Sequence, residues 1–311
     1  MMKRQEIKAD YRTNKKLAIQ KTNTVLRKIL VYGFLVLMAL IILLPFYWML
    51  NISFQSNNEI FDSLSISFFP QEFSPDNYVK VFLYETSTSA GTTFTRYLTN
   101  TLVVAFFSTV FGTIFSILIA FALARLNFKG RDLLFTLLLA TMMIPGEMMV
   151  ISNFITVSRL GWVHDPGIGS YLAMIVPFLV SIFHVYLLRQ AFKQIPNELY
   201  YAAKVDGCTD RKYLWRVMVP MAKSSIITIT ILKVMGTWNA FIWPDLVADN
   251  KFKLVTTWLR SPFTDSTFEV QRPLTNLQMA ATVIVTLPLL LLFVIFRKYI
   301  MSGVSRSGVK G

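Results

Sequence analysis

Long runs with few or no charged residues dominate the pattern of hydrophobic and polar positions. Six of these runs are long enough to cross a bilayer, and they cover residues 29–54, 98–124, 133–157, 167–188, 224–244 and 274–296. A helix needs about 20 apolar residues to cross a hydrocarbon core of roughly 30 Å. Two runs are interrupted, one by Pro145 and Glu147 and the other by Lys233. Pro145 is expected to kink the third helix or mark its outer end. We therefore predict six membrane-spanning helices.

The alternative spanning structure, a closed β-barrel, requires apolar and polar residues to alternate. The first run, LVLMALIILLPFYWML, shows no alternation. It is also too long for a signal-peptide core and no small-residue cleavage site follows it, so we expect it to be retained. The predicted fold class is all-α, a polytopic membrane protein. Residues 1–28 form a basic tail, expected to be disordered, and residues 29–311 form the transmembrane domain.

Charged residues make up 15% of the 311 residues, whereas a soluble domain has about 25%. The net charge is +14, which raises the question of a nucleic-acid partner. However, 23 Lys and Arg residues fall in segments on the side of the termini and 7 in the loops on the other side. By the positive-inside rule, both termini lie in the cytoplasm of a cell-membrane protein. Topology accounts for the basic charge, and we expect no nucleic-acid partner.

Patterns for catalysis and metal binding are missing from the sequence. It has two histidines, His164 and His184, one cysteine, Cys208, and no H-E-x-x-H motif. The segment GVSRSGVK near the carboxyl end lacks the lysine that directly follows the second glycine of a phosphate-binding loop. Apart from Glu147, no carboxylate lies in a predicted span, whereas ion-coupled carriers place carboxylates there. We expect no enzymatic activity, ATP site, cofactor or metal in this chain.

The cytoplasmic loop at about residues 194–220, QIPNELYYAAKVDGCTDRKYLWRVMVP, carries the most distinctive local pattern. Pro196 suits the first turn of a helix, and Glu198 suits the positive end of its dipole. Gly207 fits the left-handed residue that ends a helix, and Thr209 can cap a second one. The loop is therefore predicted to be a compact helix–turn–helix.

One face of the first predicted helix contains Leu199, Ala202, Ala203 and Asp206, at spacings of three and four. The paired alanines leave this face flat. A surface linker would not need that face together with a terminating glycine, so we interpret the loop as a docking element for another protein.

The loop resembles the coupling loop of ABC importer permeases, whose pattern is IP-x-EL-x-EAA-x-x-DG and, further on, LP. The matching residues are Ile195, Pro196, Glu198, Leu199, Ala202, Ala203, Asp206, Gly207 and Pro220. Tyr201 replaces the glutamate that, in the family, pairs with a basic group of the ATPase, and Val219 replaces leucine. Because Tyr201 cannot form that ion pair, the contact must be weaker or compensated.

Further stretches resemble the carbohydrate branch of this family, the maltose-transporter-like permeases. They include PFYWMLNISFQSNNEIF, PDNYVKVF, AFALARLNFKGRDLL, MMIPGEMMVI, GTWNAFIWPDLV and the final GVKG. The resemblance extends over about residues 29–311. It implies a type I ABC importer permease fold and a function in moving a sugar or oligosaccharide into the cytoplasm by alternating access.

The resemblance also implies partners and docking residues. The partners would be a second homologous permease, two ATPase subunits that bind ATP and Mg, and an extracellular sugar-binding protein. The residues expected to dock on the ATPase are Glu198, Leu199, Tyr201, Ala202, Ala203, Asp206 and Gly207, with Gly308, Val309 and Lys310 of the cytoplasmic tail at residues 297–311.

Substrate contacts are expected in the fifth predicted helix. Trp238 and Asn239 offer an indole face and an amide to a sugar, or else pack near the membrane surface, an aromatic-belt role that suits Trp243 better. Lys233 can line the pore, contact the partner permease or extend to the inner surface. Two other functions stay open, an ABC permease for a non-sugar solute such as a peptide or polyamine, and an ion-coupled carrier.

Overall fold

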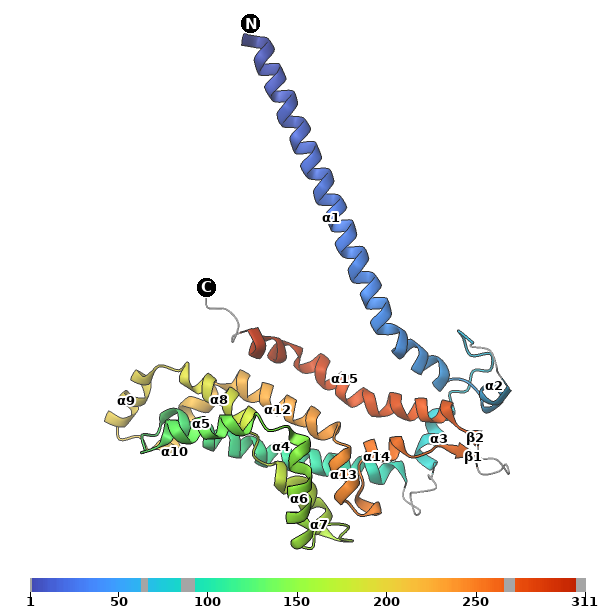
Figure 1. The fold of residues 1–311 in the computed structure, drawn as a ribbon, viewed down its shortest axis with the longest axis vertical. Coiled ribbons are helices and arrows are strands. Elements are labelled where there is room, and N and C mark those ends of the chain that lie inside the picture. Colours follow the sequence, from blue (N-terminus) through green and yellow to red (C-terminus); the bar gives the residue numbers. More distant parts are fainter. Residues whose placement is uncertain (1, 63–66, 85–92, 266–271, 306–311) are drawn as a thin grey trace.

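The computed structural model describes residues 2–62, 67–84, 93–265 and 272–305, and its regular structure is almost entirely helical (Figure 1). Three helices are long and apolar enough to cross a membrane without interruption. They are α1 (Met2–Ser53), apolar over Val25–Ser53, α4 (Phe94–Arg125), and α15 (Thr275–Ser305), apolar over Thr275–Tyr299. They correspond to the first, second and sixth predicted runs.

Three helix pairs bent at a short break bring the number of candidate spans to six, if each pair crosses once. The pairs are α5 (Arg131–Thr141) with η1 (Gly146–Met148) and α6 (Met149–Arg159), bent by 87°, α7 (Ile168–Ile175) and η2 (Val176–Phe178) with α8 (Ile182–Lys193), bent by 48°, and α10 (Asp210–Tyr213), η3 (Leu214–Met218) and α11 (Val219–Met221) with α12 (Lys223–Trp238), bent by 82°. Pro145, Pro177 and Pro220 lie at or near these breaks, since proline cannot donate the helical hydrogen bond. The kink expected at Pro145 is present.

Helix α4 lies at the centre of the fold. Its buried residues recur every three or four positions, as at Tyr97, Val104, Ser108, Gly112 and Ala120. One stripe of the helix therefore faces the protein, while exposed phenylalanine and leucine side chains on the other side suit a lipid surrounding. The stripe packs against α8 and α12, so three candidate spans meet along it.

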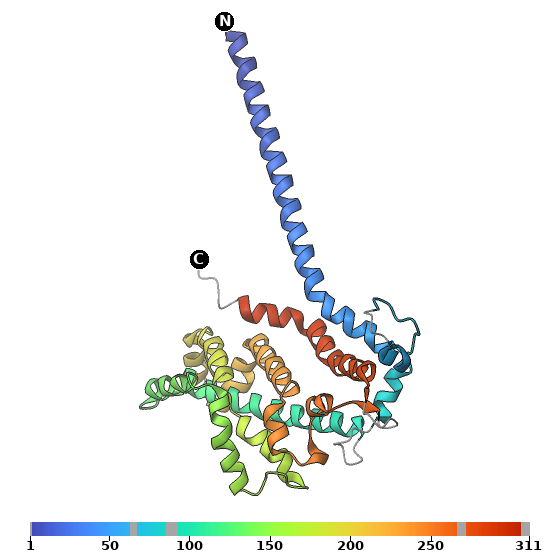
Figure 2. The same ribbon diagram turned by 45° about the vertical axis from the view of Figure 1, so that its right-hand side comes forward.

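Helix α1 stands apart from the rest of the fold. None of its most apolar 18-residue window is buried. Its carboxyl-terminal part lies near the beginning of α15, and its amino-terminal end points away from the body in both views (Figures 1 and 2). The helix begins at Met2, so residues 2–28 are helical, whereas the sequence predicted a disordered tail there.

The remaining elements are short. They are α9 (Asn197–Val205) in the predicted cytoplasmic loop, and, in the loops predicted to be outside, α2 (Asn57–Asp62), α3 (Asn77–Leu83), α13 (Ile242–Val247), η4 (Asn250–Phe252), α14 (Val255–Arg260) and the antiparallel strands β1 (Thr264–Asp265) and β2 (Arg272–Pro273). Figure 1 places α9 and the β1–β2 pair at opposite ends of the body. Buried Asn100 of α4 anchors the segment around η4 by donating to the carbonyl oxygens of Lys251 and Lys253, at 2.9 and 3.1 Å.

Candidate functional site

The predicted coupling loop forms a helix, a tight turn and a second helix at one end of the body. Helix α9 follows Pro196, whose ψ of 140° is extended. Gly207 has a φ of +72°, a left-handed conformation that costs a glycine little, and it ends the helix. Its N–H donates to the carbonyl of Lys204 at 3.0 Å, and the N–H of Cys208 donates to the carbonyl of Ala203 at 2.8 Å. Helix α10 follows directly, so the predicted helix–turn–helix is present.

Arg125, the last residue of α4, holds the start of α9. Its side chain is almost completely buried. Nη2 donates to the carbonyl oxygen of Phe192 at 2.7 Å and to that of Ile195, and Nη1 donates to Oδ1 of Asn197. A planar guanidinium suits several acceptors at once. One side chain therefore connects α4, the end of α8 and the beginning of α9.

A second group of contacts fixes α9 on α10. The hydroxyl of Tyr200 donates to Oδ1 of Asp210 at 2.7 Å, and Nζ of Lys204 lies 2.8 Å from the same oxygen. The rings of Tyr200 and Tyr213 meet edge to face, with centroids 5.0 Å apart. The hydrogen bond that Lys204 donates to Asp210 raises the pKa of Lys204. These contacts hold the two helices together across an exposed turn.

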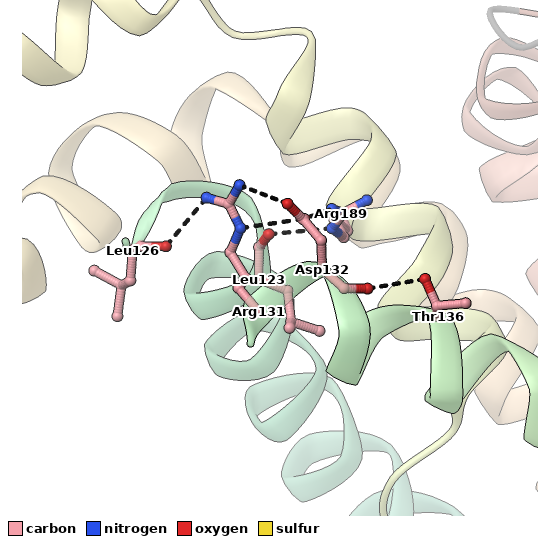
Figure 3. A network of polar contacts seen from close by, with 6 residues as sticks. All are labelled: Leu123, Leu126, Arg131, Asp132, Thr136 and Arg189. Atoms are coloured by element: carbon pink, nitrogen blue, oxygen red, sulfur yellow. Dashed lines mark hydrogen bonds and ion pairs between the residues drawn. The ribbon is translucent and has the colours of Figure 1, made fainter. Parts of the chain in front are cut away.

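Charged hydrogen bonds also join the adjoining ends of α4, α5 and α8 (Figure 3). Arg189 of α8 donates through Nε to the carbonyl of Leu123 at 3.1 Å, and its guanidinium lies 3.7 Å from the ring centroid of Phe135. Asp132 accepts from Arg131 at 3.3 Å and from Arg189 at 3.4 Å. The ends of α4 and α8, to which Arg125 connects α9, are therefore linked in turn to α5.

The outward face of α9 differs in part from the predicted docking face. Of the predicted docking residues in this loop, all but Ala203 are exposed, and Asn197, Lys204 and Val205 are exposed as well. Ala203 is half-buried and packs against the hydrophobic core, so it does not share the exposed face of Ala202. Val205, which the sequence analysis did not select, is 88% exposed. Its spacing of three and four residues from Ala202 and Tyr201, which places it on their side of a helix, was the signal that could have identified it.

A cavity of about 730 Å³ lies among the spans, lined by residues of α4, η2, α8, α12 and α13. Lys233 and Asn239, two of the predicted substrate residues, line it. Trp238 does not, because it is buried and its Nε1 donates to the carbonyl of Val285 at 3.2 Å. Its indole face is therefore used for packing within the protein, and the structure does not bring it together with the other two.

Lys233 has backbone partners at the break between η2 and α8. Its Nζ donates to the carbonyl oxygens of Phe178 and Leu179, at 3.1 and 2.7 Å. These carbonyls lie where the helix is interrupted, so an ammonium group there supplies missing donors and offsets the negative helix end. Gly112 makes the room, because a Cβ at that position would lie 2.0 Å from Nζ. Of the alternatives for Lys233, the structure favours a position beside the cavity.

Trp243 supplies another missing donor in the same broken pair. Pro177 has no N–H with which to reach the carbonyl of Ala173, four residues earlier. Nε1 of Trp243 donates to that carbonyl at 2.9 Å. Trp243 is buried and lines the cavity, whereas the sequence assigned it to an aromatic belt at the membrane surface.

Residues 112–306 match the family described as "binding-protein-dependent transport system inner membrane component". The chain belongs to this family. It is therefore an integral membrane permease subunit of the kind that is not itself an enzyme.

Relatives agree with this assignment, and a solved structure has the same fold. The arabinooligosaccharides transport system permease protein AraQ of Bacillus subtilis (strain 168) is 31% identical, over 89% of this chain and 94% of the relative. The polygalacturonan/rhamnogalacturonan transport system permease protein YtcP of the same organism is 29% identical, over 91% and 97%. A bacterial ABC transporter involved in the import of alginate has a chain with a TM-score of 0.74 at 23% identity, covering 87% of this chain and 95% of that one. The predicted permease fold is thus confirmed.

The remaining predictions concern the carboxyl-terminal tail, metal binding and the histidine of the fourth span. Gly308, Val309 and Lys310 lie outside the described residues. Within the described ranges, no group of three or more His, Cys, Asp or Glu side chains could hold a metal ion. His184 lines the cavity, and its Nδ1 is buried without a hydrogen-bond partner in the part of the chain that the structure describes.

Proposed function

We propose that this permease is one transmembrane subunit of an ATP-binding-cassette importer that moves a sugar or oligosaccharide into the cytoplasm. The observation that carries the proposal is helix α9, exposed at the end of the body and tied to α4 and α8 by Arg125, in a chain of the binding-protein-dependent family. Relatives named as permeases for arabinooligosaccharides and for polygalacturonan/rhamnogalacturonan match about nine-tenths of its length, which supports the saccharide class.

The charge distribution supports an orientation with α9 in the cytoplasm. The chain has 23 Lys and Arg residues in its termini and in the two loops on their side, and 7 in the loops on the other side. The positive-inside rule then gives cytoplasmic termini and an extracellular β1–β2 end. Helix α9 would face the ATPase subunits, and the opposite end would face a binding protein that delivers the sugar.

The outward face of α9 is the proposed docking surface for an ATPase subunit. Tyr201, Ala202 and Val205 give it an apolar character, so burial of apolar area would contribute much of the affinity. A cavity of about 570 Å³ beside Tyr201 is lined by Arg125, Arg131, Lys193 and polar neighbours. These cations suit an acidic side chain of the ATPase. Such a contact would compensate, with reversed polarity, for the ion pair that Tyr201 cannot form.

The proposed mechanism transmits motion and makes no covalent bond. ATP and Mg would be held by two ATPase subunits, whose closure moves α9 as a rigid body. Because Arg125 connects α9 to α4 and α8, that movement would reach helices that line the central cavity. A second permease would enclose the cavity from the other side, and access to it would alternate between the two membrane faces.

The test is reconstitution of the chain with its partner permease and ATPase subunits in proteoliposomes. ATP hydrolysis and uptake of labelled sugar are measured with and without the sugar-loaded binding protein. Stimulation of both by the loaded binding protein is the expected result. Failure of the chain to associate with any ATPase, or hydrolysis that ignores the binding protein, would refute the proposal.

The docking surface is tested separately by Val205→Asp, with Asn250→Asp as the matched control on an exposed residue of the opposite side. The charge on α9 should reduce co-purification of the ATPase at least tenfold, because it must be desolvated in the contact. Equal recovery with both variants would exclude Val205 from the docking surface.

A further inference from the structure

The cavity among the spans has a one-sided distribution of charge. Its basic lining groups are Lys233 of α12 and Arg260 of α14, with the imidazole of His184 nearby. No Asp or Glu occurs among the described residues that line it. Lys233 is buried, so its charge is costly to keep there without a counter-charge, whereas Arg260 is exposed to solvent.

Arg260 is prepared to bind an anion. Its guanidinium lies over the ring of Phe241, 3.9 Å from the ring centroid, which fixes the plane of the group. Within the described ranges, it has no carboxylate at ion-pair distance. Asp245 lines a smaller cavity that Arg260 also borders, but its Oδ1 is paired with Lys253 Nζ at 3.0 Å. The N–H groups of Arg260 are therefore available for two parallel hydrogen bonds to an oxyanion.

Lys233 adds a second positive charge deeper in the cavity. Two of its three N–H donors are used by the carbonyl oxygens of Phe178 and Leu179. These bonds fix the ammonium group without neutralising it, and they leave one donor. A positive charge held in a poorly hydrated place attracts an anion more strongly than the same charge in water would.

The rest of the lining suits a sugar ring. Phe178, Phe241 and Trp243 present aromatic surfaces, and Trp243 is fixed by its bond to the carbonyl of Ala173. The exposed amide of Asn239 can bond hydroxyl groups. Aromatic surfaces with a few polar groups and cations therefore describe a site for a polyol that carries a negative charge.

We infer that the transported sugar carries an oxyanion, either the carboxylate of a uronic acid or a phosphate ester, and that Arg260 contacts it. This inference rests on the proposed function and narrows its substrate class. It also disfavours a polyamine, because a cationic solute would be repelled by Lys233 and Arg260.

The test uses the complete importer in proteoliposomes, with one binding protein throughout. Uptake is measured for an oligogalacturonide, for the same oligosaccharide with its carboxyl groups reduced to alcohols, and for a sugar phosphate. Wild type should take up one of the anionic probes at least tenfold faster than the reduced probe, and the two anionic arms distinguish carboxylate from phosphate. Arg260→Gln should lower this ratio at least tenfold, Arg260→Lys should have an intermediate effect, and Lys251→Gln, an exposed cation of η4, should leave it unchanged.

The two proposals fail in different ways. Faster uptake of the reduced probe than of either anion, or a ratio that Arg260→Gln does not change, would overturn the inference and leave saccharide import intact. Since the binding protein is the same in every reaction, a change in the ratio reports the permease. Absence of ATP-dependent uptake with every saccharide, together with hydrolysis that ignores the binding protein, would instead refute the proposed function.

Discussion

Replacing Arg125 with glutamine should uncouple ATP hydrolysis from import. The guanidinium donates to the carbonyls of Phe192 and Ile195 and to Oδ1 of Asn197, and it is buried. A hydrogen bond to a charged group contributes about 1.5–3 kcal/mol. A shorter amide can serve one of the three acceptors, and the losses are not additive. We therefore expect the attachment of α9 to weaken by about 2–4 kcal/mol, a factor of roughly 30 to 1,000 in the equilibrium between held and released helix.

The assay is the number of ATP molecules hydrolysed per sugar imported in proteoliposomes. Arg125→Gln should keep basal ATP hydrolysis, because the ATPase subunits are unchanged, while uptake falls at least tenfold. Amide hydrogen exchange in α9 should accelerate, since released helices open more often. Arg125→Lys keeps the charge but loses the planar fork, so an intermediate ratio is expected.

Lys129→Gln is the matched control, because this lysine is exposed in the loop that follows α4. It should leave both readouts at the wild-type value. The reasoning would be refuted if Arg125→Gln imported as much sugar per ATP as wild type while hydrogen exchange in α9 stayed unchanged.

Three further substitutions test the local geometry. Gly207→Ala should destabilise the turn by about 1 kcal/mol, because its φ is +72°, and Gly207→Asn should be milder; thermal unfolding of the purified complex checks both. Tyr200→Phe removes the hydrogen bond to Asp210 and should weaken the contact between α9 and α10 by about 0.5–1 kcal/mol, seen as faster proteolysis of the loop. Gly112→Ala should displace Lys233 and lower the yield of assembled importer, and Lys233→Ala in the same chain should recover part of it.

The spans were predictable because lipid imposes a simple rule on the sequence. An uncharged run of sufficient length needs no tertiary information to be recognised, and all six runs correspond to helices or bent helix pairs. The turn at Gly207 was predictable for a similar reason, since a left-handed residue restricts the choice of amino acid locally.

The orientation of α9 was only partly predictable. Spacing places Ala202, Ala203 and Asp206 near one another on a helix, but it does not say which face meets the protein. That is decided by Tyr200, which packs on Tyr213 and bonds Asp210 across the turn, and Ala203 lies on the same side. Val205 is exposed as a consequence.

The fourth span shows why single residues in spans resist interpretation from sequence. Pro177 removes one helical donor, and the break after it leaves carbonyl oxygens that lipid cannot satisfy. The donors come from Lys233 and Trp243, more than 50 residues further along the chain. The sequence left three roles open for Lys233 and favoured a membrane belt for Trp243. The proline in the sequence predicts that a carbonyl oxygen one turn earlier needs another donor. Only the fold shows which side chain supplies that donor. Since both donors belong to α12 and α13, these hydrogen bonds join the broken fourth span to the fifth beside the cavity that both line.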